Sequence, residues 1–170
     1  EKTLFLGNIH DRLQYYSEAI AHHIHKNENV LMFVSNHHTI GQFYFDKLSE
    51  VFPGKVIRYG VSVTPKKRME AYFRARNEGG LIILGSRSCL FLSVFRNGLI
   101  IVERPEEDEY RNEEGFKFNA VNLAIRRAEI EHIPVVLGSV SPPLEVYKRA
   151  INGELRIIEK AYPAKEQCFE

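Results

Sequence analysis

The chain has 170 residues, of which 44% are hydrophobic, which suits one domain with a substantial core and excludes a disordered chain. Its 23 Lys and Arg residues nearly balance 22 Asp and Glu residues, so attraction to nucleic acid requires local basic patches. Cys89 and Cys168 form no C-x-x-C pair, and neither a signal peptide nor a membrane-length apolar run occurs. We therefore expect a cytoplasmic protein without a thiolate zinc site, and the absence of an opening Met suggests a piece of a longer protein.

Short apolar runs alternate with helix-periodic stretches, which predicts repeated strand–helix–strand units around a parallel sheet. The predicted strands are 3–6, 30–34, 56–59, 81–84, 99–102 and 135–137. The predicted helices are 11–26, 39–52, 65–77, 119–131 and 142–151. We therefore predict one α/β lobe over residues 1–160, followed by a polar tail over 161–170. In such folds ligands bind beyond the carboxyl ends of the strands, so functional side chains are expected there.

Several sequence blocks occur in an order that is typical of a known family. They are Leu-Gly-Ser-Arg-Ser-Cys-Leu-Phe at 84–91, Gly-Leu-Ile-Ile-Val at 98–102, Glu-Glu-Gly at 113–115, Pro-Val-Val-Leu-Gly-Ser at 134–139 and Ser-Pro-Pro-Leu-Glu at 141–145. Through these blocks the chain resembles, over nearly its whole length, the first motor lobe of the PriA family of superfamily-two DNA helicases. The resemblance implies a three-layer RecA-like fold of the P-loop NTPase type, with a mainly parallel sheet between helices, and a role in replication restart.

The first strand of that family ends in a phosphate loop, G-x-x-x-x-G-K-T, whose amides and lysine hold nucleotide phosphates while its hydroxyl binds Mg²⁺. The matching stretch here runs from Leu6 through Gly7 to Leu13. Asp11 replaces a glycine and would repel phosphate, and the planar guanidinium of Arg12 is a poor substitute for the compact lysine. Leu13 cannot ligate magnesium. We therefore expect Gly7, Asp11 and Arg12 to mark a vestigial site that binds neither ATP nor Mg²⁺.

The second nucleotide motif of the family, D-E-E-H, follows the strand predicted at 99–102. This chain has Glu103-Arg104-Pro105-Glu106 at that place. Glu103 could still contact a metal ion, but Arg104 cannot accept a proton at neutral pH, and loss of a general base typically costs about 10²- to 10⁴-fold in rate. These changes predict a degenerate ATPase, and the alternative is a diverged enzyme in which Glu106 or Glu107 has become the base.

DNA contacts in such lobes come from loops that follow the middle strands. Here Arg87, with Ser86 and Ser88 beside it, is the first candidate for a phosphate contact, and the alternative is that it ties its loop to its own sheet. Lys66 and Lys67 form a basic turn that could also meet phosphate, although such a run is often only a solvated helix face.

A third family motif, S-A-T, couples nucleotide state to DNA binding, and Gly138-Ser139-Val140-Ser141 matches it. The alternative is that Ser141 caps the helix predicted to begin at Pro142. Another family loop is replaced by the sequence at 35–39, which weakens the transfer of DNA contacts there. The seven histidines lack ligand spacing, so we expect no metal site.

Three functional hypotheses follow. The first is a non-catalytic lobe that binds single-stranded or forked DNA, or assists replication proteins or a second motor lobe. The second is a structural module for protein interaction, and the third is a diverged but active ATPase. None of them requires a membrane.

Overall fold

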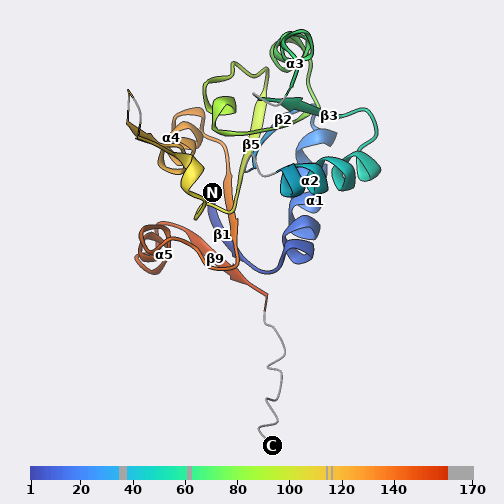
Figure 1. The fold of residues 1–170 in the computed structure, drawn as a ribbon. Helices are drawn as coiled ribbons and strands as arrows, with labels where there is room; N and C mark the ends of the chain where they lie inside the picture. The colour runs from blue at the N-terminus through green and yellow to red at the C-terminus, as the bar shows by residue number, and fades with distance from the viewer. Residues whose placement is uncertain (35–37, 61–62, 114, 116, 161–170) are drawn as a thin grey trace, which may run out of the picture.

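The computed structural model describes residues 1–34, 38–60, 63–113, 115 and 117–160 (Figure 1). Within them, parallel strands form a seven-stranded sheet in the order β3-β4-β2-β5-β8-β1-β9. The strands of this sheet are β1 (Lys2–Leu6), β2 (Asn29–Phe33), β3 (Val56–Tyr59), β4 (Ile82–Gly85), β5 (Asn97–Glu103), β8 (Val135–Ser139) and β9 (Arg156–Glu159). The helices are α1 (Ile9–His25), α2 (His38–Val51), α3 (Pro65–Asn77), α4 (Ala120–Glu131) and α5 (Leu144–Ile151).

Helices cover both faces of the sheet, as the alternating sequence pattern predicts. Helices α1 and α2 pack on one face, where Tyr16 and Tyr44 are buried. Helices α3, α4 and α5 pack on the other, where Ala71, Ala124 and Val146 lie in the second core. All residues of β2 and β8 are buried, because both faces of these strands are covered. The resulting three layers place every strand end that precedes a helix at one edge of the molecule.

Helix starts follow local capping chemistry. Thr64 caps α3 and Pro65 occupies its first turn, so the predicted boundary is confirmed. The predicted start of α5 at Pro142 is wrong, because the helix begins at Leu144 after Pro143. A residue that precedes a proline avoids the helical region, which keeps Pro142 outside the helix. Pro143 holds the cap position without a side-chain cap, so Ser141 does not cap α5.

Some elements were not predicted. Strand β9 pairs with β1 at one edge of the sheet, and all but one of its residues are exposed. A two-stranded antiparallel pair, β6 (Arg111–Asn112) and β7 (Phe118–Asn119), follows β5. The structure also has two short 3₁₀ helices, η1 (Arg87–Phe91) and η2 (Asp108–Tyr110). The tail predicted at 161–170 lies outside the described residues. Of the described helices, none has the length and apolarity needed to cross a membrane.

Candidate functional site

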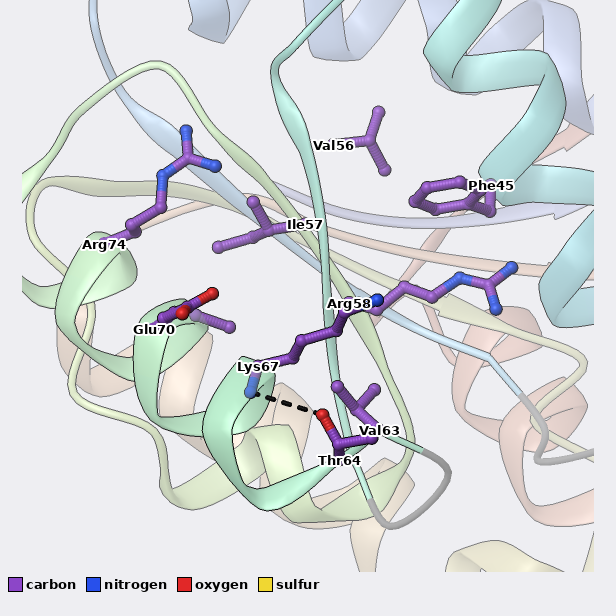
Figure 2. Close-up of a pocket in the computed structure, with 10 residues that line it drawn as sticks. Phe45, Val56, Ile57, Arg58, Val63, Thr64, Lys67, Glu70 and Arg74 are labelled. Carbon is purple, nitrogen blue, oxygen red and sulfur yellow. Dashed lines mark hydrogen bonds between the residues drawn. The ribbon is translucent and has the colours of Figure 1, made fainter.

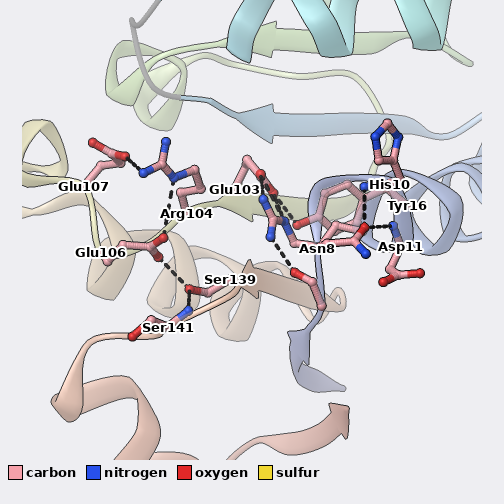
Figure 3. Close-up of polar contacts among 12 residues, drawn as sticks. Asn8, His10, Asp11, Tyr16, Glu103, Arg104, Glu106, Glu107, Ser139 and Ser141 are labelled. Carbon is pink, nitrogen blue, oxygen red and sulfur yellow. Dashed lines mark hydrogen bonds and ion pairs between the residues drawn. The ribbon is translucent and has the colours of Figure 1, made fainter. Parts of the chain in front are cut away.

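Strands β1, β8 and β5 are neighbours, and their carboxyl ends form the center of the candidate site (Figure 3). In the register of the sheet, Leu6 lies beside Ser139 and Glu103 lies beside Gly138. The sheet therefore brings together the three stretches that were predicted to correspond to nucleotide-binding and coupling motifs, although they are far apart in the sequence.

The connection between β1 and α1 consists of two residues, Gly7 and Asn8. The Asn8 Oδ1 atom caps α1, accepting hydrogen bonds from the amides of His10 at 2.9 Å and Asp11 at 3.0 Å (Figure 3). The Gly7 amide donates to the Ser139 carbonyl at 3.1 Å. Amides that a phosphate loop would offer to a nucleotide are therefore already used within the chain.

Helix α1 extends through the positions that match the end of the phosphate loop. Asp11, Arg12 and Leu13 all lie within it. The Asp11 carboxylate pairs with the Lys160 ammonium, with 3.2 Å between Oδ1 and Nζ. A helical turn thus occupies the place of an open loop, and its acidic side chain is neutralised by the segment that follows β9.

Arg12 and Glu103 form a buried ion pair. The Arg12 Nε atom lies 3.1 and 3.0 Å from the two Glu103 carboxylate oxygens, and Nη2 lies 2.6 Å from Oε1. Nη1 donates to the Gly7 carbonyl at 2.6 Å. The two side chains are only 4% and 0% exposed. Arg12, predicted to stand at the lysine position, and Glu103, predicted to stand at the metal position, therefore satisfy each other.

Tyr16 completes this buried network. Its hydroxyl donates to Glu103 Oε2 at 2.7 Å, and its side chain is fully buried. Burial raises the pKa of Tyr16, and the Glu103 charge raises it further, so the phenol stays a neutral donor. Burial lowers the pKa of Arg12, but the hydrogen bond and charge of Glu103 outweigh this effect and raise it. The Arg12 guanidinium therefore stays charged, and Tyr16 holds Glu103 from a third direction.

Gly138 makes room for this network. A Cβ atom at this position would overlap the Tyr16 hydroxyl and lie 2.9 Å from Arg12 Cδ. Sequence reasoning did not identify Tyr16 or this role of Gly138. A glycine inside the apolar run of β8 was the available signal, because such a glycine often marks a close approach.

A second tyrosine lies against the same network. Tyr44 of α2 is buried, with 5.9 Å between its ring centroid and that of Tyr16. Burial raises the pKa of Tyr44, with a further contribution from Glu103. Its hydroxyl has no hydrogen-bond partner among the residues that the structure describes. Helix α2 thereby covers the network from one side.

Arg104 continues directly from the buried acid and has a left-handed backbone, with φ of 54°. Its amide donates to the Gly138 carbonyl at 2.8 Å. Its guanidinium pairs with Glu106 at 3.5 Å and Glu107 at 2.5 Å (Figure 3). Arg104 therefore engages both carboxylates that the sequence offers as an alternative base.

The coupling motif contacts the same loop. Ser139 Oγ donates to Glu106 Oε2 at 2.7 Å and accepts from the Ser141 amide at 3.0 Å. Ser139 is fully buried, whereas Ser141 is exposed. The hydroxyl of Ser139 thus joins the two loops that follow β5 and β8.

The candidate DNA loop after β4 is tied to its own domain. Arg87 Nη1 donates to the carbonyls of Glu109 and Arg111, at 3.0 Å each. Ser86 is buried, and its Oγ lies 3.3 Å from that of Ser88. This geometry favours the alternative in which Arg87 holds the loop to its own domain, and a phosphate contact by these residues stays a prediction.

Cys89 lies in η1 of the same segment and is fully buried. Its Sγ atom lies 3.5 Å from the Tyr59 carbonyl, to which it donates. Burial raises the pKa of the Cys89 thiol to about 12. The thiol is therefore protonated and enclosed, which suits a packing role in this loop.

Lys66 and Lys67 lie exposed in the first turn of α3, directly after β3. They therefore lie at the same carboxyl edge of the sheet as Arg87. In the strand order, β5 with Glu103 is two strands from β4 and three strands from β3. Among the described residues, no three His, Cys, Asp or Glu side chains gather as metal ligands.

Comparisons with known proteins identify relatives for this chain. It is 39% identical to the replication restart protein PriA of Bacillus subtilis over 77 residues, which are 45% of this chain and 10% of that protein. It is 36% identical to PriA of Chlamydia pneumoniae over 101 residues, which are 58% of this chain and 13% of that protein. The chain thus spans only about a tenth of the length of these relatives. No protein-family model matches it.

Solved structures share its fold. The Mss116p DEAD-box helicase domain 2 bound to an RNA duplex matches 97% of this chain and 65% of that chain, with a TM-score of 0.67 and 14% identity. The C-terminal domain of S. cerevisiae Dbp5 matches 94% of this chain and 89% of that chain, with a TM-score of 0.64 and 8% identity. The predicted three-layer RecA-like fold is confirmed. Over part of its length the chain is similar to PriA proteins, and it has the fold of a helicase domain.

Proposed function

We propose that this PriA-like lobe acts in replication restart without hydrolysing ATP, as a first-lobe derivative that binds DNA through the first turn of α3, the helix that follows β3. The observation that supports the loss of catalysis is the buried Arg12–Glu103 pair. Its members occupy the positions where the family's phosphate lysine and metal-binding carboxylate would act.

Nucleotide entry would have to disrupt this pair. Withdrawal of Arg12 toward a phosphate would leave Glu103 buried without its cation, and breaking a buried pair typically costs about 3–5 kcal/mol. The first turn of α1 would also have to unwind and release the amides that Asn8 caps. Triphosphate binding would have to offset both losses, and Leu13 supplies no hydroxyl for its magnesium ion.

The test is a titration with a fluorescent non-hydrolysable ATP analogue and Mg²⁺, together with phosphate release measured with and without forked DNA. We expect no saturable binding at micromolar nucleotide and no DNA-stimulated release. Variants Glu106→Gln and Glu107→Gln serve as controls for a displaced base. DNA-stimulated release that either variant abolishes would establish the diverged enzyme in place of the inactive lobe.

Exposed cations support DNA binding at the other end of the same edge. Lys66 and Arg68 lie in the exposed first turn of α3, and no ion pair engages either side chain within the described residues. Phosphate contacts by such residues release counterions, so the affinity should fall as salt rises. Arg87 already donates to two carbonyls and is therefore assigned to loop support in this proposal.

Labelled single-stranded and forked DNA titrated at two salt concentrations will test this step. We expect Lys66→Glu with Arg68→Glu to weaken binding uniformly across sequences and to reduce the salt slope by about one for each phosphate that the variant no longer neutralises. Lys148→Glu, on exposed α5, is the matched control and should leave both quantities unchanged. Absence of binding at low salt would favour the protein-interaction module.

A further inference from the structure

A groove runs along the free edge of the sheet. Strand β3 is the edge strand, and it lies between α2 on one face and α3 on the other. The groove has a volume of about 380 Å³. Figure 2 shows Phe45 of α2 on one side of the β3 ribbon, with Lys67 and Arg74 of α3 on the other. The edge of β3 therefore forms the floor between two helical walls.

The backbone of β3 offers hydrogen bonds to this groove. The Lys55 carbonyl accepts from the Ile82 amide of β4 at 2.9 Å. Because successive residues of a strand direct their backbone groups to opposite sides, Ile57 also turns its backbone toward β4. Val56 and Arg58 then direct their amides and carbonyls to the open edge. Such a row of groups is a template for one more strand.

Side chains around the edge supply apolar surface on both faces. Phe45 and Val56 pack with the core on the α2 side, whereas Ile57 and Ala71 pack with the core on the α3 side. An added strand sends alternate side chains to the two faces of a sheet. Each face would therefore offer it an apolar contact.

The walls of the groove are basic. Arg58 lies with its guanidinium carbon 4.2 Å from the Phe45 ring centroid and donates to neutral Gln42. Lys67 has no ion pair with any described residue, while Arg74 pairs with Glu78 outside the lining. Glu70 is the one acid among the lining residues, against three cations.

We propose that an extended acidic segment of a partner protein binds in this groove as an additional strand along β3. Its backbone pairs with the free groups of Val56 and Arg58, and its carboxylates lie against Arg58 and Lys67. Parallel or antiparallel pairing would serve equally. This inference does not depend on the proposed DNA contacts, which use Lys66 and Arg68.

A polypeptide suits the groove better than a nucleic acid does. The free amides and carbonyls of β3 alternate with the spacing of another strand, whereas a phosphate backbone carries no matching donors. Lys67 and Arg58 lie on opposite sides of the strand and each fits one acidic side chain. The apolar floor has no aromatic platform that stacks successive bases, since Phe45 is covered by Arg58.

The probe is a fluorescent peptide with the sequence Glu-Asp-Val-Thr-Val-Asp-Glu, whose acids flank the apolar center in either orientation. It is titrated into the full chain at low and moderate salt. Two control peptides accompany it, one with lysines in place of the four acids and one N-methylated at its three central residues. We expect the first peptide to bind and both controls to bind at least about tenfold more weakly, since they lack charge complementarity or strand hydrogen bonds.

Two substitutions at one position separate charge from backbone. Arg58→Val removes the cation and keeps the edge amide, and it should weaken binding about tenfold. Arg58→Pro also removes the amide that faces the open edge, and a further loss of about fivefold is expected. Lys67→Ala should weaken binding about fivefold, and Lys148→Ala, remote on α5, should leave it unchanged within about twofold.

Hydrogen exchange supplies an independent measurement. The Arg58 amide should exchange freely in the unliganded chain and become protected when the peptide is bound. The proposal is overturned by absence of binding at millimolar peptide, by equal binding of the N-methylated peptide, or by an Arg58 amide that stays unprotected. Displacement of the peptide by oligo-dT in a manner that Lys67→Ala prevents would instead assign the groove to nucleic acid.

Discussion

The two ends of the sheet's carboxyl edge differ in what their side chains contact. At the β1, β8 and β5 end, Arg12, Glu103 and Tyr16 satisfy one another in the interior. At the β3 end, Lys67 and Arg58 line the groove, and neither forms an ion pair with an acidic side chain among the described residues. The comparison teaches that charged residues in this RecA-like fold indicate binding only where the chain leaves them unpaired. We call the end with the paired, buried charges of Arg12 and Glu103 the closed end, and the end with the unpaired charges of Lys67 and Arg58 the open end.

The largest effect is expected from breaking the closed end. Glu103→Gln leaves the Arg12 cation buried without its counterion, which should lower the free energy of unfolding by about 3–5 kcal/mol. The double variant Arg12→Met with Glu103→Leu removes both charges and should lose less than the single variant. Urea unfolding of both variants measures this difference. A double variant that loses as much stability as Glu103→Gln, or more, would contradict a coupled pair.

The second-largest effect is expected from alkaline pH, which should lower the free energy of unfolding. Burial raises the pKa of Tyr16 and of Tyr44 above the ordinary value of 10.0. Above pH 10 the unfolded chain loses these protons while the folded chain keeps them, so stability falls as pH rises, by about 1.4 kcal/mol per pH unit for each phenol. Urea unfolding between pH 8 and 11 measures the slope. Tyr16→Phe should reduce this slope by the contribution of one phenol. An unchanged slope would show that the pKa of Tyr16 is not raised by folding.

Gly138→Ala tests how tightly the closed end is packed. Its Cβ would displace the Tyr16 hydroxyl and Arg12, and overpacking of this kind typically costs about 1–3 kcal/mol. In a Tyr16→Phe background the same substitution should cost less, because the hydroxyl is gone. Thermal unfolding of the four chains gives the coupling energy, and strict additivity would show that Gly138 and Tyr16 do not interact.

The Asn8 cap of α1 should contribute a smaller amount to the free energy of unfolding. Asn8→Ala leaves the His10 and Asp11 amides without their acceptor and should cost about 1 kcal/mol. Asn119→Ala removes an equivalent cap from α4 and provides the matched value. Similar losses at the two caps would show that Asn8 acts as an ordinary cap. A gain in nucleotide affinity with Asn8→Ala would show that its side chain had blocked a functional loop.

The open end should tolerate substitution with almost no change in stability. Lys66→Gln and Lys67→Gln replace exposed side chains that no described carboxylate pairs with, and such changes usually stay within about 0.5 kcal/mol. Their effects should appear in binding instead. A loss of more than about 1 kcal/mol on either substitution would place these lysines in the folded framework and remove the contrast between the two ends.

Periodicity and capping identified most of the fold because both act locally. The bounds of β3 and α3 agree with those predicted. An apolar run bounded by turn residues defines β3, and the Thr64-Pro65 start defines α3. Strand β9 was missed because an exposed edge strand lacks an apolar run. The start of α5 was misplaced because a second proline shifts the cap.

The candidate site could be located in the sequence, but its contacts could not. Arg12 and Glu103 were both identified as departures from family motifs, yet nothing in the sequence indicates that these residues, 91 positions apart, form a pair. Tyr16 was not identified as a site residue, because its hydrogen bond to Glu103 depends on how β5 and α1 pack. Long-range side-chain geometry is set by the sheet order, which single motifs do not encode.

The buried sulfur of Cys89 can report how often the segment around it opens. A buried, protonated thiol within η1 is inert toward iodoacetamide until the surrounding segment opens, because only the exposed thiolate reacts. With Cys168 replaced by Ser, the rate of alkylation therefore counts the opening events of the loop that joins β4 to β5. Ligands that stabilise the closed form of this loop should therefore slow the alkylation of Cys89, even where they do not contact the loop.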